Sequence, residues 1–128
     1  MNNTPADLYY TEAHVWLHLD DEGIVTVGIT DYAQSELGDV VFVELPEVNS
    51  DVSAGDEISI VESVKTASDI HAPVSGEVLA VNDALKDTPE LINSSPYDKG
   101  WILRIQMTDT GELEELLNAG EYVEICSA

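Results

Sequence analysis

Positively charged side chains are scarce in this sequence. Only 4 of its 128 residues are Lys or Arg, against 26 Asp plus Glu, so the formal net charge is -22. The first cationic side chain along the chain is Lys65. Nucleic acid and anionic membrane surfaces are poor partners for a surface of this charge.

Cysteine and long apolar runs are also lacking. Cys126 is the only cysteine, which excludes an intramolecular disulfide and suits a reducing compartment. No apolar run approaches the roughly 20 residues that span a bilayer. Residues 1–7 have neither a basic segment nor an apolar segment of a signal peptide, and we expect them to form a flexible tail. We therefore expect a soluble protein of the cytoplasm.

The excess of acidic residues has two interpretations. Hydrophobic residues make up 44% of the chain and recur in alternating runs, which argues against disorder. In molar salt the Debye length falls to about 3 Å, so repulsion between surface carboxylates is largely screened. We interpret the composition as an adaptation to a very salty cytoplasm, the alternative being an ordinary acidic bacterial protein.

The hydrophobic pattern predicts a mainly β fold in a single domain, residues 1–128, with two small sheets packed together. Thr30 and Gly38 bound a predicted short helix over 31–37, and leucines at helical spacing predict a C-terminal helix near 111–118. Aromatic residues within the apolar runs are predicted to be core: Trp16, Phe42 and Trp101. The predicted strands cover residues 14–19, 24–29, 39–45, 56–63, 67–72, 76–81 and 101–107, with a loop over 82–100.

Lys65 lies where the chain is predicted to turn between two strands, at the tip of a hairpin of about residues 56–72. An exposed turn is an ordinary place for a lysine, and an ion pair with Glu62 or Asp69 would contribute at most about 1 kcal/mol. A chain that has so few lysines, however, keeps one at a protruding tip. A primary amine that can be acylated explains this better than charge alone.

Other candidate sites are weak. His14 and His18 are four residues apart, but on a strand that spacing spans about 13 Å, too far for one metal ion. His71 is predicted to be structural. No G-x-S-x-G or similar nucleophile motif is present, so we expect no intrinsic hydrolase activity and no metal site.

Four segments together carry a resemblance to a known family. They are "GITDYAQSELGDVVFVELPEV", "VESVKTASDI", "APVSGEVLAVN" and "LINSSPYDKGWILRI". In order and spacing they resemble the H protein of the glycine cleavage system, from about Leu8 to Ile125. The resemblance implies a barrel-sandwich hybrid fold with lipoic acid covalently bound as N6-lipoyllysine at Lys65.

The resemblance also implies a non-catalytic carrier with a defined set of partners. In the family, a pyridoxal-phosphate glycine dehydrogenase decarboxylates glycine and loads the aminomethyl unit onto the lipoyl arm. A folate-dependent aminomethyltransferase then unloads it, dihydrolipoyl dehydrogenase reoxidises the arm, and a lipoyl-attaching enzyme installs it. The hard chemistry belongs to the cofactor and the partners.

One departure from the family pattern concerns the place where the loaded arm rests. The family usually has His-Glu-Trp where this chain has His14-Val15-Trp16. Asp69 matches the family pattern near the arm, the alternative being a strand residue that faces solvent. Glu12 and Glu62 are further candidates for carboxylates close to the arm.

Two other carriers and a purely structural binding protein are alternatives. Biotin carriers typically flank their lysine with methionines, whereas Lys65 has Val64 and Thr66 as neighbours. A lipoyl relay protein without a role in glycine cleavage would need the same hairpin. A structural binding protein would leave the lysine at the tip unexplained.

Overall fold

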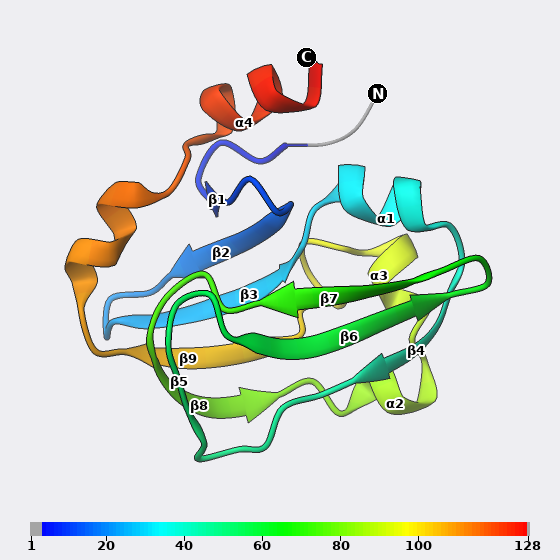
Figure 1. Ribbon diagram of the computed structural model, residues 1–128, viewed down its shortest axis with the longest axis horizontal. Coiled ribbons are helices and arrows are strands. Elements are labelled where there is room, and N and C mark those ends of the chain that lie inside the picture. Colours follow the sequence, from blue (N-terminus) through cyan, green and yellow to red (C-terminus); the bar gives the residue numbers. More distant parts are fainter. Residues whose placement is uncertain (1–3, 128) are drawn as a thin grey trace.

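The computed structural model describes residues 4–127, and two antiparallel sheets make up most of it (Figure 1). The mainly β fold with two small packed sheets, predicted from the alternating pattern, is confirmed. The larger sheet has six strands, in the spatial order β1 (Tyr9–Tyr10), β2 (Val15–Leu19), β3 (Ile24–Ile29), β9 (Leu103–Met107), β8 (Gly76–Val81) and β5 (Asp51–Val52).

The smaller sheet contains the hairpin that bears Lys65. Its three strands are β4 (Val40–Glu44), β6 (Glu57–Ser63) and β7 (Ala67–His71), with β6 in the centre. The turn between β6 and β7 projects from one end of the molecule, next to the end of α1 (Asp31–Leu37) (Figure 1). β6 and β7 are paired as a hairpin, with residues 64–66 at its tip.

The main core lies between the two sheets. Inward side chains of the larger sheet, such as Val27 and Ile105, are fully buried, and Val61 of the smaller sheet is too. A second, smaller core of Tyr10, Trp16 and Tyr122 lies on the other side of the larger sheet. On β2, Val15 and Leu17 face the main core and Trp16 between them faces the smaller one, as expected for side chains that alternate between the two faces of a strand.

Helices fill the ends of the sheets. Thr30 caps α1 by accepting a hydrogen bond from the Ala33 N–H, as predicted, and Gly38 follows the helix with a φ of 82°. The predicted loop over 82–100 contains two one-turn helices, α2 (Ala84–Asp87) and α3 (Leu91–Ser94).

The prediction for the C-terminus was wrong in its boundaries. The segment near 111–118 is a 3₁₀ helix, η1 (Thr110–Glu115), and the α-helix is α4 (Ala119–Ser127). In α4, Tyr122 stacks on Tyr10 of β1 with ring centroids 4.7 Å apart. The leucine spacing located a helical segment, but this aromatic contact with β1 holds the longer helix further along the chain.

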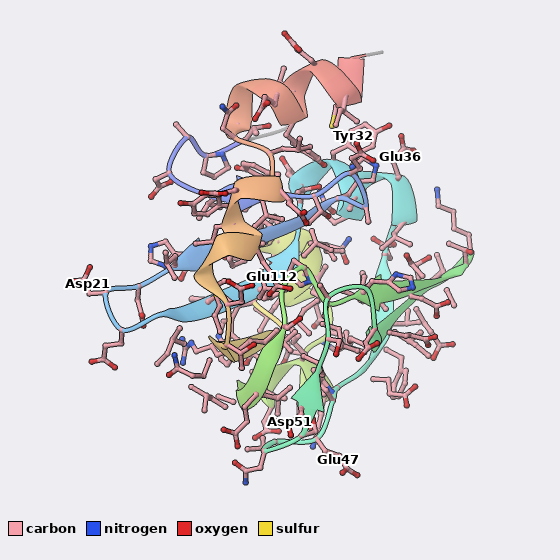
Figure 2. The ribbon with its side chains drawn as sticks, turned by 60° about the vertical axis from the view of Figure 1, so that its left-hand side comes forward. Asp21, Tyr32, Glu36, Glu47, Asp51 and Glu112 are labelled. Carbon is pink, nitrogen blue, oxygen red and sulfur yellow. The ribbon has the colours of Figure 1, made fainter. Side chains whose placement is uncertain are left out.

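The acidic side chains lie on the surface. The buried polar residues among those described are Thr30, Ser59, Ser63 and Asn82, and none is an acid. Asp21 and Glu47 point outward from separate loops (Figure 2). An ion pair joins Lys86 to Asp83 on the surface, at 3.4 Å, and some other carboxylates accept hydrogen bonds, as Glu112 does from the N–H and hydroxyl of Ser75.

No helix in the described part of the chain is both long and apolar enough to cross a membrane.

Candidate lysine hairpin and cleft

The turn that presents Lys65 is held by hydrogen bonds to Ser63. The Ser63 hydroxyl accepts from the backbone N–H groups of Lys65 and Thr66, at 3.3 and 3.2 Å, and the Ser63 N–H donates to the Thr66 carbonyl at 2.7 Å. The Val64 N–H donates to the carbonyl of Asp39 at 3.0 Å, which ties the turn to the start of β4. The exposed lysine therefore extends from a rigid base.

The start of β4 is in turn fixed by Asn93 of α3. Its side-chain amide donates to the carbonyl of Gly38 at 2.8 Å and to Gln34 Oε1 at 3.0 Å. Its side-chain oxygen accepts from the Val40 N–H at 2.8 Å. One asparagine thus links α1, α3 and β4 directly beneath the lysine.

A cleft of about 430 Å³ lies between α1 and β7, next to the lysine turn. Much of its wall is apolar, including Ile29, Leu37 and Ile70. Tyr32 and Glu36 give it a polar edge, and both extend from α1 (Figure 2). A hydrogen bond from Tyr32 to the Glu36 carboxylate raises the pKa of the Tyr32 hydroxyl. An aliphatic chain attached to Lys65 fits such a cleft, because its methylene groups would contact apolar side chains.

His14 lines the same cleft, and a contact with Tyr122 holds its imidazole in place. Its Nδ1 is 2.7 Å from the Tyr122 hydroxyl, which is also 2.6 Å from Thr30 Oγ1. Burial lowers the pKa of His14 from its ordinary 6.5, and the Glu36 carboxylate partly opposes this shift. The neutral imidazole is therefore favoured in the fold. Its left-handed backbone, with a φ of 67°, directs the chain from Ala13 into β2.

The three carboxylates predicted near the arm lie outside the cleft lining. Asp69 is exposed on β7 opposite Ile60, and Glu62 is half-buried on β6 opposite Phe42 and Ala67. Glu12 is exposed two residues before His14. Sequence reasoning missed Tyr32 and Glu36 and did not place His14 in a cleft with them, because only the fold brings α1 next to the residues before β2.

The other residues that the sequence analysis discussed are buried to different extents. Val15, where the family usually has glutamate, is 1% exposed and packs in the main core. Trp16 is core as predicted, but Phe42 is 51% exposed, so that prediction was wrong. Trp101 is half-buried and Arg104 stacks on its ring at 4.3 Å. His71 is exposed on β7.

No cluster in residues 4–127 has three His, Cys, Asp or Glu side chains placed to hold a metal ion. His14 lies before β2, and His18 is exposed on that strand.

Comparison with known proteins agrees with this architecture. The family model described as glycine cleavage H-protein matches residues 8–128. The glycine cleavage system H protein of Salmonella typhimurium is 59% identical over 122 residues, which cover 95% of each chain. That of Psychrobacter cryohalolentis is 57% identical over 122 residues, covering 95% of this chain and 97% of the other.

A solved structure shows the same fold. The crystal structure of a glycine cleavage system H protein from Mycobacterium marinum superposes with a TM-score of 0.89 at 44% identity, covering 97% of this chain and 99% of that one. A protein of this fold, with a lysine at the tip of a hairpin, is a carrier and not a catalyst. This chain belongs to the glycine cleavage H-protein family.

Proposed function

We propose that Lys65 carries a lipoyl group in amide linkage and that the chain is the mobile carrier of the glycine cleavage system. The observation that carries the proposal is the placement of Lys65. It is exposed at the tip of a hairpin, its turn is fixed by Ser63, and a cleft with an apolar wall lies beside it. Family membership supports the same role.

Attachment needs a free amine and an activated lipoyl group. The deprotonated Nζ of Lys65 attacks the lipoyl carbonyl, an amide C–N bond forms, and the bond to the activating group breaks. The amine proton goes to solvent and the activating group leaves with the electron pair of that bond. Because the turn holds the backbone of Lys65, little conformational entropy is lost when the attaching enzyme binds this side chain.

The protein's own part after attachment is positional. When bound, the lipoyl group supplies a sulfur that takes up the aminomethyl unit of glycine and a dithiol that can be reoxidised. Ile29, Leu37 and Ile70 give the arm an apolar surface to lie on, and an arm bound there would exclude water from that wall. Glu36 accepts hydrogen bonds at the polar edge, where a cationic amine would be favoured.

We assign four partner enzymes to the chain. They are the decarboxylating, pyridoxal-phosphate glycine dehydrogenase, the folate-dependent aminomethyltransferase, dihydrolipoyl dehydrogenase and a lipoyl-attaching enzyme. The first three act in that order on the arm, and all are expected in the cytoplasm. Asp69, Glu12 and Glu62 remain candidates for carboxylates near the arm when it leaves the cleft.

The test is reconstitution of glycine decarboxylation with purified partner enzymes and lipoylated chain. Lys65→Arg should abolish activity, because arginine keeps the charge but offers no amine that can be acylated. The matched control is Lys86→Arg, since Lys86 is an exposed surface lysine on α2. Activity in the Lys65→Arg variant would refute the proposal. Lipoylation of Lys65 without support of glycine decarboxylation would favour a lipoyl relay.

A further inference from the structure

An exposed apolar patch lies on the β4 side of the lysine hairpin. It consists of Val41, Phe42 and Val64, which are 54%, 51% and 69% exposed. Phe42 is the only phenylalanine in the chain. Burying these apolar side chains away from water is favourable in free energy. A partner that covers them would therefore bind more tightly.

Two backbone features bring the patch together. The pairing of β4 with β6 shifts register between Val40 and Phe42, so Val41 is the extra residue of a bulge and is exposed next to Phe42. Phe42 lies directly opposite Glu62, and Val64 follows two residues later in the turn, where its N–H donates to the carbonyl of Asp39 just before β4. The patch is therefore continuous with the turn that bears Lys65.

The patch and the cleft lie at opposite edges of the smaller sheet. β4 is one edge strand and β7 is the other. The cleft is lined from β7 by residues that include Ser68 and Ile70. Val41 and Phe42 of the patch thus lie on the edge strand furthest from Ser68 and Ile70.

We propose that this patch docks the enzyme that attaches the lipoyl group to Lys65. The inference rests on the proposed function and names the surface that selects one of its partners. The attaching enzyme must bring its reacting carbonyl to Nζ itself, so it must contact the residues that flank Lys65. Enzymes that act on the far end of a long arm can work at a distance from the turn.

The chemistry of the patch specifies the complementary surface. Its centre is apolar and carboxylates border it, with Asp39 and Glu44 exposed and Glu62 half-buried. The matching surface on the attaching enzyme is an apolar recess for Phe42 bordered by Lys or Arg side chains. Three side chains make a small contact, which suits a transient complex that must release its product.

The experiment uses the full unmodified chain with a purified lipoate-attaching ligase, lipoate and ATP, and follows modification by intact mass. Phe42→Ser is expected to raise KM for the chain at least tenfold with a smaller change in kcat, whereas Phe42→Leu stays within about threefold of wild type. Val123→Ser is the matched control, because Val123 is 45% exposed on α4 and lies outside the patch. Thermal unfolding of each variant checks that the fold is retained.

A second measurement follows binding alone, without the modification reaction. In a Lys65→Arg background, which cannot be modified, the Kd for the ligase loaded with lipoate and ATP is measured by surface plasmon resonance. Phe42→Ser should raise this Kd at least tenfold and Glu62→Gln should raise it about two- to fivefold. A KM and a Kd for Phe42→Ser within twofold of the controls would overturn the inference.

Two further outcomes separate this inference from the proposed function. If wild-type chain gains no lipoyl group on Lys65, the proposed function fails. If wild type is modified normally and Phe42→Ser raises KM only for dihydrolipoyl dehydrogenase, the patch serves another partner and this inference alone is overturned.

Discussion

The side chain of Lys65 lies across Gly38, the residue that follows α1. Its Cε is 3.3 Å from the place that a Cβ at position 38 would occupy, and its Nζ is 3.9 Å from it. Gly38 has a φ of 82° and a ψ of -156°, a region populated almost only by glycine. The Lys65 side chain can therefore lie in this position because residue 38 has no side chain.

Gly38→Ala should lower the free energy of unfolding by about 1–3 kcal/mol through backbone strain. It should also displace Lys65, seen as changed NMR chemical shifts of its Cε methylene. Gly55→Ala is the matched control, because Gly55 has a φ of 93° and no atom within 4 Å of the added carbon. Urea unfolding should show a loss in both variants. Unchanged Lys65 shifts in Gly38→Ala would contradict the contact.

Asn93→Ala should destabilise the base of the hairpin. The change removes three hydrogen bonds and leaves the Val40 N–H and the Gly38 carbonyl without this partner. We expect a loss of about 2–3 kcal/mol in the free energy of unfolding. Ser94→Ala, at an exposed neighbouring position of α3, should change it by less than about 0.5 kcal/mol. Equal effects of the two substitutions would show that Asn93 has no special role.

The fold was predictable where apolar runs are bounded by clear turn residues. β3 and β6 lie close to the predicted ranges, and the capping residues of α1 behave as expected. The prediction that Phe42 is buried was wrong because a bulge breaks the alternation of β4. Nothing in the sequence of this strand predicts that bulge. β1 and β5, of two residues each, are too short to show any period.

The site was predictable only in part, for a related reason. The placement of Lys65 at a turn follows from local sequence, since β6 and β7 are adjacent along the chain. The cleft requires residues 13–14, α1 and β7 to meet, and no local pattern specifies that meeting. Val15 illustrates the limit, because its burial depends on which face of β2 covers the core.

The pH dependence of stability should include a contribution from His14. Burial lowers its pKa in the folded state below the 6.5 of the unfolded chain. As the pH falls through 6.5 the unfolded state therefore takes up a proton before the folded state does, and stability declines. Between pH 7.5 and 5.5, urea unfolding should show a smaller decline for His14→Gln than for wild type. Equal slopes for His14→Gln and wild type would exclude the effect.

Salt should stabilise the fold if the net charge of -22 is an adaptation to a salty cytoplasm. The Debye length is about 30 Å at 0.01 M and about 3 Å at 1 M, so repulsion between surface carboxylates weakens with added KCl. The urea midpoint should rise with KCl, and less so in the variant with Asp21→Asn, Glu47→Gln and Asp51→Asn. A midpoint that stays flat or falls would reject the adaptation without affecting the carrier assignment.

The central claim is that the side-chain amine of Lys65 carries a lipoyl group. Peptide mapping of the modified chain tests this claim most directly. The full-length protein is isolated from its native host, digested and analysed by mass spectrometry to locate any lipoyl group. We predict one lipoyl group per chain, on the peptide that contains Lys65, with Lys86 and Lys99 unmodified. A lipoyl group found on Lys86 or Lys99, with Lys65 free, would contradict the account.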